Sequence, residues 1–407
     1  MAQLHDGAFA GVRVVDFTWV AAGPATIKYL ADCGATVIHV ESGTQPEALR
    51  ITPPFRDGCP GLNRSAYQAG FNNNKYGLSL NLNHPHAGTI IERLVRWADI
   101  IAESFTPGTV QRWGLDYESL VKIKPDIIMY STCQQGQTGR HSRIAAYGTQ
   151  LVSLAGFTHL TGWPDRGPTG PYGPYTDTPT PPVGAAAIAA ALECRRRTGR
   201  GTHIDVSQYE AALDFIAPVL MDFTVNGEVA KPRGNRCEHA APHGVFPCRG
   251  EDRWCAVAVF TEDEWRALCR VLDRPDWADA PEFSSLLRRK RNEERLEELL
   301  AEETVKYAAA DLMARLQAAG VPAGVAEDSE QLQSDPQLTH RGYFRELSHR
   351  EIGPHYYEEP PFILPASPAA LNKAAPCLGE DTDYVCTEIL GIPDAEFIAL
   401  MAEGVFE

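Results

Sequence analysis

The chain has 407 residues, enough for a large hydrophobic core and for two domains. Hydrophobic residues make up 44% and charged residues 22%, which excludes a collagen-like or a disordered chain. The formal net charge of −16 argues against a nucleic-acid partner and against an anionic membrane, so an anionic ligand needs a local basic pocket.

The first part of the chain predicts strands alternating with helices. Strands are expected at residues 11–17 and 36–41 around a helix that ends at Gly34, which indicates a βαβ unit of a parallel sheet. Further strands are expected at 78–82, 99–103, 126–131 and 202–206, and helices at 85–97, 117–124, 145–155 and 183–197, with a long apolar helix to about 225. Residues 42–70 predict a long surface loop. The first turn lacks G-x-G-x-x-G, which argues against an NAD-dependent enzyme.

The pattern changes near residue 226. Antiparallel strands are expected at 245–248 and 254–260, followed by a helix at 262–272 and charged amphipathic helices at 285–318. We therefore expect a small α+β domain at residues 226–326. It would be inserted between residues 1–225 and 327–407, which together form a larger α/β domain.

Cysteine usage and hydropathy bear on the compartment. Ten cysteines lack the spacing of a zinc site or a C-x-x-C motif, and Cys33, Cys255 and Cys269 fall in apolar segments. The first ten residues do not resemble a signal peptide, and no apolar run has membrane-spanning length. These features predict a cytoplasmic protein with reduced thiols, no metal site and no membrane segment.

Asp177 is the candidate nucleophile. It lies in a loop of turn-forming residues, 173–181, directly before the small-residue run 183–192. This places its carboxylate at or just before a helix N-terminus, where backbone N–H groups and the helix dipole favour the charged form. A carboxylate held in this way can attack an activated acyl carbon. The alternative is that Asp177 only caps the helix.

Two groups of residues are candidates for binding a nucleotide-like ligand. Lys75 follows three asparagines before a predicted strand, so it is either a phosphate or adenine contact or part of a polar turn. Phe105, Arg112 and Trp113 follow the predicted strand at 99–103, and together they can hold a base and a phosphate.

Several short motifs, in this order and at this spacing, resemble the class III coenzyme A-transferases of the CaiB/BaiF type, the family of formyl-CoA transferase. The resemblance covers nearly the whole chain, and residues 17–24 also resemble succinyl-CoA:benzylsuccinate CoA-transferase subunits. The motifs are R-V-V-D-F-T at 13–18, A-G-P at 22–24, N-K at 74–75, G-Q-T-G at 136–139, T-G-R-G at 198–201, D-V-S at 205–207, G-V-P-A-G at 320–324 and D-P-Q at 335–337.

The resemblance implies a Rossmann-like large domain, a small domain and an interlocked dimer, either a homodimer or a heterodimer with a related subunit. It implies transfer of coenzyme A from an acyl-CoA donor, such as succinyl-CoA, to a carboxylic acid acceptor. Coenzyme A is then a substrate, no cofactor is tightly bound, and the intermediates are aspartyl anhydrides and an aspartyl-CoA thioester. By the same resemblance Asp177 is the nucleophile, and the coenzyme A contacts are Val20, Lys75, Phe105, Arg112 and Trp113.

The chain departs from formyl-CoA transferase at the site. Ala21, Ser42 and Cys133 stand where that enzyme has a glutamine, an arginine and a lysine, and residues 234–244 replace its glycine-rich loop. These differences argue against formyl-CoA or oxalate as a substrate. Within the replaced loop, Arg236, His239 and His243 are candidates to meet the acyl carboxylate.

Three alternatives stay open. Intramolecular transfer between two carboxylates of one diacid would use the same Asp177. A racemase acting on α-methylacyl-CoA needs a histidine opposite the aspartate, but Tyr147 stands at that position, and His141 and His159 are out of register. A non-catalytic CoA-binding subunit of a heteromeric transferase would not require Asp177.

Overall fold

The structure is a computed structural model that describes residues 7–144 and 147–407. It divides into two units. The first comprises the residues up to Phe157, Gly170–Val229 and Gln337–Glu407, and the second comprises Thr158–Thr169 and Ala230–Pro336. The first two residues of the helix expected at 145–155 lie outside the described residues.

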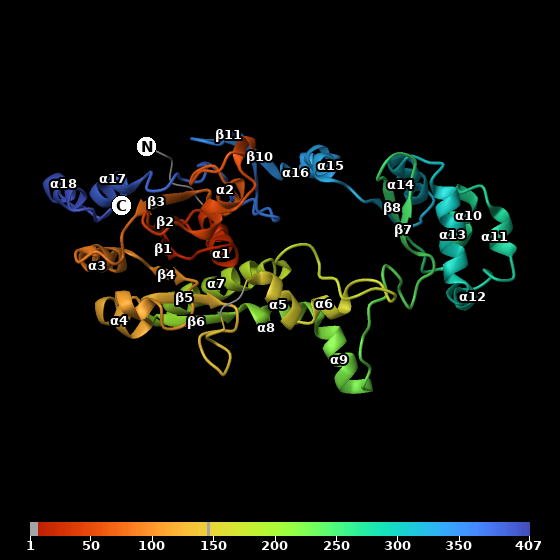
Figure 1. Ribbon diagram of the computed structural model, residues 1–407, viewed down its shortest axis with the longest axis horizontal. Helices are drawn as coiled ribbons and strands as arrows, with labels where there is room; N and C mark the ends of the chain where they lie inside the picture. The colour runs from red at the N-terminus through yellow and green to blue at the C-terminus, as the bar shows by residue number, and fades with distance from the viewer. Residues whose placement is uncertain (1–6, 145–146) are drawn as a thin grey trace. The chain divides into compact units, whose positions relative to one another are not determined.

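The first unit is built on a six-stranded sheet in which all neighbouring strands are parallel, in the order β3-β2-β1-β4-β5-β6 (Figure 1). This strand order confirms the predicted Rossmann-like α/β class. The order reverses between β1 and β4, and such a switch point opens a crevice beyond the carboxyl ends of the strands. The strands are β1 (Arg13–Phe17), β2 (Thr36–Glu41), β3 (Lys75–Ser79), β4 (Ile100–Glu103), β5 (Ile128–Cys133) and β6 (Thr202–Ser207).

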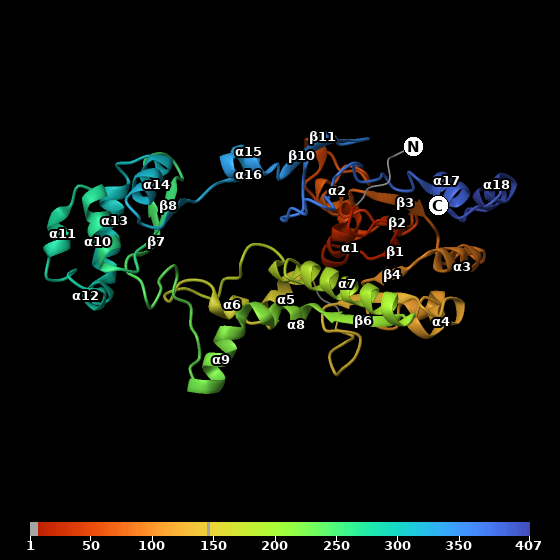
Figure 2. The ribbon, with the colours of Figure 1, turned by 180° about the vertical axis from the view of Figure 1, so that it is seen from behind.

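Both faces of the central strands are buried, which explains their continuous apolar sequences. Helices α1 (Ala22–Asp32) and α7 (Thr180–Thr198) lie side by side on one face (Figure 2), where Val14 points. On the other face, Val15 and Phe17 pack against α3 (Ala87–Trp97), α4 (Tyr117–Ile123) and α18 (Asp394–Ala402). A Cβ on Gly184 of α7 would lie 2.4 Å from the Tyr130 hydroxyl, so the close packing of α7 on the sheet requires this glycine.

The segments that connect the strands contain short helices and one hairpin. The segment 42–70, which was predicted to be a surface loop, contains short helices and buried residues. Glu47 and Arg50 of that segment are buried, because the Arg50 guanidinium donates to both oxygens of the buried Glu41 carboxylate at 2.6 Å. The remaining elements of the first unit and its borders are η1 (Ala48–Ile51), η2 (Arg56–Gly58), α2 (Ala66–Asn72), η3 (Val110–Trp113), α5 (Gly148–Leu154), α6 (Phe157–Leu160), η4 (Tyr175–Asp177), α8 (Gln208–Leu213), η5 (Asp214–Ile216), α9 (Ala217–Asn226), α16 (Pro336–Arg341), β10 (Phe344–His349), β11 (Gly353–Glu358), α17 (Thr382–Tyr384) and η6 (Val385–Ile389).

The long helix expected to reach residue 225 is instead divided into α8, η5 and α9. None of the residues of α9 is buried. None of the described helices combines the length and the apolar character that a membrane span requires.

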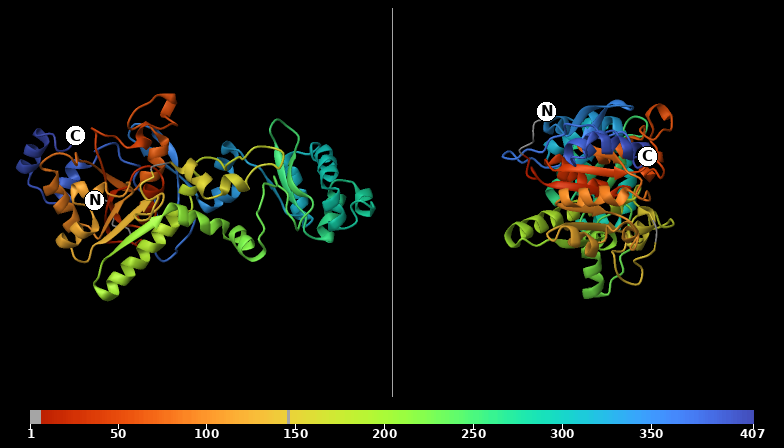
Figure 3. Two further views of the ribbon diagram at one scale, coloured as in Figure 1. Left: turned by 60° about the horizontal axis from the view of Figure 1, so that its bottom comes forward. Right: turned by 90° about the vertical axis from the view of Figure 1, so that its left-hand side faces the viewer.

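The second unit contains a three-stranded antiparallel sheet in the order β7-β8-β9, against which helices pack (Figure 3). Trp265, Leu296 and Leu312 belong to its core, and the buried Arg289 donates to both carboxylate oxygens of Glu262. Its elements are β7 (His243–Pro247), β8 (Trp254–Ala258), α10 (Glu262–Val271), α11 (Pro275–Asp279), α12 (Leu286–Arg291), α13 (Glu293–Thr304), α14 (Ala309–Ala318), β9 (Ala323–Val325) and α15 (Ser329–Ser334).

Candidate active site

The loops that follow β1 and β4 meet at the switch point of the sheet. The backbone N–H of Trp19 donates to Ser104 Oγ at 2.8 Å, and this hydroxyl donates to the Trp19 carbonyl at 3.2 Å. These loops line a cleft of about 450 Å³, which we call the strand-end cleft. Its lining includes Trp19, Val20, Ala21, Ser104, Cys133, Tyr147, Gly148 and Asp177.

A second cleft, of about 430 Å³, is lined by α1, α2, the loop at 172–178 and the segment after β11. We call it the tyrosine cleft, because five tyrosines line it: Tyr29, Tyr67, Tyr172, Tyr175 and Tyr343. Ala21 and Asp177 line both clefts. Asp177 is therefore accessible from two cavities.

The carboxylate of Asp177 does not cap helix α7. The N-cap position belongs to Pro179, and Asp177 ends the preceding 3₁₀ turn, with its backbone N–H donating to the Pro174 carbonyl at 2.9 Å. Among the described residues, none donates a hydrogen bond to this carboxylate, and burial raises its pKa to about 6. The expectation that the helix terminus favours the charged form is therefore wrong in direction. The carboxylate lies before the helix cap, and burial outweighs the dipole.

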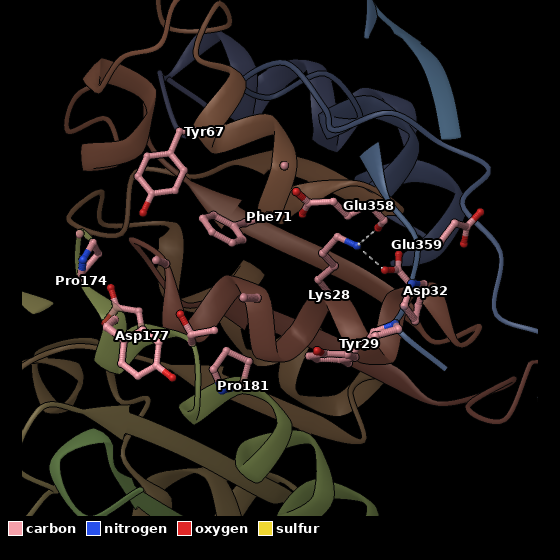
Figure 4. Close-up of a pocket in the computed structure, with 18 of the residues that line it drawn as sticks. Lys28, Tyr29, Asp32, Tyr67, Phe71, Pro174, Asp177, Pro181, Glu358 and Glu359 are labelled. Atoms are coloured by element: carbon pink, nitrogen blue, oxygen red, sulfur yellow. Dashed lines mark hydrogen bonds and ion pairs between the residues drawn. The ribbon is translucent and has the colours of Figure 1, made fainter. Parts of the chain in front are cut away.

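Two neighbours define the space around Asp177. A Cβ on Gly148, the first residue of α5, would lie 2.2 Å from Pro174 Cβ and 3.2 Å from Asp177 Oδ1, so only glycine fits there. Across the tyrosine cleft, the hydroxyl of Tyr67 points toward the loop of Pro174 and Asp177 (Figure 4). Burial, together with the charge of Asp177, raises the pKa of Tyr67, so this hydroxyl stays protonated and can donate.

Val20, a predicted coenzyme A contact, lines the strand-end cleft with a left-handed backbone. Its φ is 66°, a conformation that β-branched residues rarely adopt. The backbone N–H of Val20 donates to Oε1 of the buried Glu47 at 2.6 Å. This hydrogen bond holds the strained wall of the cleft in place.

The structure does not bring Lys75 to either cleft. Its side chain is fully buried, and Nζ donates to Asp16 Oδ2 at 2.9 Å, Asn72 Oδ1 at 2.8 Å and the Pro24 carbonyl at 3.1 Å. All three ammonium protons are therefore used inside the protein. Burial acts to raise the pKa of Asp16, but Lys75 and His39 outweigh it and hold that pKa well below its usual range. The predicted coenzyme A contact is thus placed as a buried counter-ion, because Asp16 needs a cation.

His39, Glu41 and Glu47 form a buried group of the kind that can ligate a metal ion. The Nε2 atom of His39 lies 3.6 Å from Glu41 Oε2 and 3.9 Å from Glu47 Oε2. However, Arg50 already pairs with Glu41. Burial acts to lower the pKa of His39, but the charges of Asp16 and Glu41 outweigh burial and raise this pKa to about 9. The charged imidazole therefore balances these carboxylates, and we assign no metal here.

Three of the predicted ligand contacts do come together at the surface. The ring centroids of Phe105 and Trp113 are 5.7 Å apart, and the guanidinium of Arg112 lies 5.4 Å from the Trp113 ring. Trp19 extends the row, with its ring centroid 5.3 Å from that of Phe105. Sequence reasoning missed Trp19, although its position directly before Val20 was a usable signal.

The tyrosine cleft was not predicted from the sequence. Helix α1 contributes Ala25, Lys28, Tyr29 and Asp32 to it, at spacings that place them on one helix face. Lys28 Nζ donates to Asp32 Oδ2 at 2.6 Å and to the Glu358 carbonyl at 2.9 Å (Figure 4). The helical spacing was visible in the sequence, but the contact with β11 was not.

The three candidates of the loop at 234–244 belong to the second unit, whereas Cys133 belongs to the first. Arg236 donates to both carboxylate oxygens of Glu297, at 2.9 and 2.6 Å, His239 is exposed, and His243 lines a groove within the second unit. Cys133 lines the strand-end cleft, but burial raises the pKa of its thiol to about 11. At neutral pH this thiol is protonated, so Asp177 is the more suitable nucleophile.

Known proteins resemble this chain over most of its length. A sequence model of the family described as CoA-transferase family III matches residues 9–382. The chain is 30% identical over 382 residues to a succinate–glutarate CoA-transferase of Agrobacterium fabrum, which covers 93% of this chain and 95% of the relative. It is 27% identical over 394 residues to a succinyl-CoA–D-citramalate CoA-transferase of Chloroflexus aurantiacus, covering 97% of each chain. A crystal structure of a CaiB/BaiF family protein from Brucella suis superposes with a TM-score of 0.86 at 28% identity, covering 94% of this chain and 99% of the other.

Proposed function

Because the chain belongs to CoA-transferase family III, as its motifs predicted, we propose that it transfers coenzyme A between dicarboxylic acids with Asp177 as the nucleophile. The substrate class is taken from the names of its relatives, which include succinate, glutarate and D-citramalate, all dicarboxylic acids. The observation that carries the proposal is the Asp177 carboxylate, which lines both clefts and has no hydrogen-bond donor among the described residues.

The chemistry proceeds by covalent catalysis. An Asp177 oxygen attacks the thioester carbonyl of the donor, the C–S bond breaks, and a mixed anhydride and the coenzyme A thiolate result. The thiolate attacks the Asp177 carbonyl carbon, which releases the donor acid and leaves an aspartyl-CoA thioester. The acceptor carboxylate attacks this thioester to form a second anhydride, and the thiolate then takes the acceptor acyl group and frees Asp177.

The two clefts bind different parts of the substrates in this proposal. The strand-end cleft takes the pantetheine arm, and the row that starts at Trp19 in its lining and continues through Phe105 and Trp113 to Arg112 takes the adenine and phosphates. The tyrosine cleft takes the acyl group and the free acids. Asp177 at the junction reaches a carbonyl carbon from either side.

The raised pKa suits this role. A carboxylate with a pKa of about 6 is mostly ionised at neutral pH, yet it is less strongly solvated than an exposed carboxylate and so is a better nucleophile. Tyr147, which lines the strand-end cleft where a racemase would need a histidine, gives the racemase alternative no support.

A dimer is part of the proposal. Helix α9 exposes apolar side chains, with Met221 64%, Phe223 57% and Val225 78% exposed. Such a surface is typical of an interface. We expect sedimentation of the purified chain to give twice its monomer mass. A monomer that pairs only with a related chain would instead indicate a heterodimer.

The decisive experiment is to trap the intermediate. The protein is incubated with succinyl-CoA, quenched, digested and analysed by mass spectrometry, with and without hydroxylamine. We expect coenzyme A to be attached to Asp177, and hydroxylamine to convert this residue to a hydroxamate. Asp177→Asn should show neither product, whereas Asp165→Asn, a control at an exposed aspartate, should show both. Binding of coenzyme A without any adduct in the unaltered protein would favour a non-catalytic subunit.

A further inference from the structure

We propose that Lys28 binds the distal carboxylate of the dicarboxylic substrate while the proximal carboxyl group reacts with Asp177. This inference rests on the proposed function, because it assigns the recognition of the substrate within the same site. It makes Lys28 the residue that distinguishes dicarboxylic from monocarboxylic acids.

Lys28 is the only lysine, arginine or histidine among the described residues that line the tyrosine cleft. Its side chain is 13% exposed, so the ammonium is largely desolvated and an incoming carboxylate competes with little water. Figure 4 shows Lys28 and Asp177 on opposite sides of the cleft. A substrate that bridges the cleft therefore places one end at each residue.

The hydrogen bonds of Lys28 leave one donor for a ligand. A lysine ammonium has three protons. One goes to Asp32 Oδ2 and one to the Glu358 carbonyl, and the described part of the chain offers no acceptor for the third. The other oxygen of Asp32 accepts from the side-chain amides of Asn73 and Asn74, at 2.7 and 2.8 Å. Asp32 thus orients Lys28, while part of its own charge is satisfied by these amides.

The acidic residues near Lys28 do not block this approach. The Glu359 carboxylate is paired with Arg345 at 2.7 Å, and Glu358 is an exposed residue, so solvent screens its charge. Asp32 is already paired with Lys28 itself. The third proton of Lys28 is therefore the remaining cationic donor in the described lining of the cleft.

A dicarboxylic acid that meets both residues places its carbons inside the tyrosine cleft. Asp177 and Lys28 lie on opposite sides of this cleft, so an acid with carbons between its carboxyl groups is favoured over oxalate, whose two carboxyl groups are adjacent. The rings of Tyr67 and Phe71, 5.2 Å apart, offer apolar surface for the carbons between them.

The test compares two acceptors of equal chain length, glutarate and valerate, at saturating succinyl-CoA, so that weaker binding of the donor's own distal carboxylate does not enter the comparison. In Lys28→Gln, the KM for glutarate should rise about tenfold or more, the loss expected for a charge-assisted hydrogen bond. The KM for valerate and both kcat values should stay within about twofold, because the chemistry at Asp177 is untouched. Lys28→Arg should restore the preference for glutarate, and Lys122→Gln, at an exposed lysine, should change nothing.

A folding defect is separated from a loss of recognition by a second variant. Lys28→Gln leaves Asp32 buried without its cation, so the double variant Lys28→Gln/Asp32→Asn removes both charges together. It too should lose the preference for glutarate. Equal KM changes for glutarate and valerate in both variants would overturn the role of Lys28 while leaving the proposed function intact. Absence of transfer to any acid by the unaltered protein would overturn the proposed function itself.

Discussion

The Asp177→Asn variant should keep the shape of both clefts but lose the partly buried negative charge that lines them. Burial raises the pKa of this carboxyl group from 3.8 to about 6. Each unit corresponds to about 1.4 kcal/mol of differential interaction, which gives at most about 3 kcal/mol. Because the carboxylate still faces two clefts, solvent screening reduces this figure, and we expect a gain in stability of about 1–2 kcal/mol at neutral pH. The same variant should lose transfer activity by several orders of magnitude.

The pH dependence fixes the sign of this effect. The folded protein has the higher pKa, so it binds the Asp177 proton more tightly than the unfolded chain does. The buried charge therefore does not lower the unfolding free energy below about pH 4, lowers it progressively as the pH rises to about 6, and has its full effect above that pH. The Asp177→Asn variant has no charge at this position, so its unfolding free energy is not lowered in this way.

Urea unfolding at several pH values measures the difference. We expect Asp177→Asn and the unaltered protein to have equal unfolding free energies near pH 4, and the variant to be more stable at pH 7 and above. Asp165→Asn, at an exposed position, should show no such divergence. A variant that is less stable than the unaltered protein at pH 7 would refute the reasoning, because it would mean that Asp177 makes a stabilising contact.

Three further predictions follow from the site. The value of kcat/KM with succinyl-CoA should fall as the pH decreases through about 6, because Asp177 becomes protonated; a rate that stays constant to pH 5 would exclude Asp177 ionisation as its origin. Gly148→Ala should lower kcat by about 100-fold when measured in steady-state assays, because the new Cβ displaces the loop at Pro174; an unaltered kcat would contradict the close packing. Lys75→Met should lower the unfolding free energy by about 3–5 kcal/mol, because Asp16 is left buried without a cation; normal stability with weakened coenzyme A binding would instead support the original prediction of a ligand contact.

The elements of the sheet were predictable because their signals are local. The apolar runs at β1 and β2 are bounded by glycine and polar residues, and the predicted strand at 36–41 coincides with β2. Likewise, the turn-forming residues around Asp177 and the small residues after it predicted the entry into α7.

The surroundings of Lys75 and Lys28 were not predictable, because they depend on partners distant in the sequence. The run of asparagines before Lys75 resembles a polar turn, but Lys75 begins β3 because Asp16, 59 residues earlier, supplies its counter-charge. In the same way, Lys28 is held against the carbonyl of Glu358, 330 residues later. The direction of the Asp177 pKa shift follows from burial, which no local pattern reports.

The left-handed backbone at Val20 has a consequence for engineering this enzyme. A β-branched residue in this region stores about 1–3 kcal/mol of strain, and here Glu47 secures it from outside the described lining of either cleft. A mutagenesis library restricted to residues that face the cavities would therefore leave out a position that shapes one of them. Efforts to alter selectivity are better extended to residue 47 and to its buried neighbours.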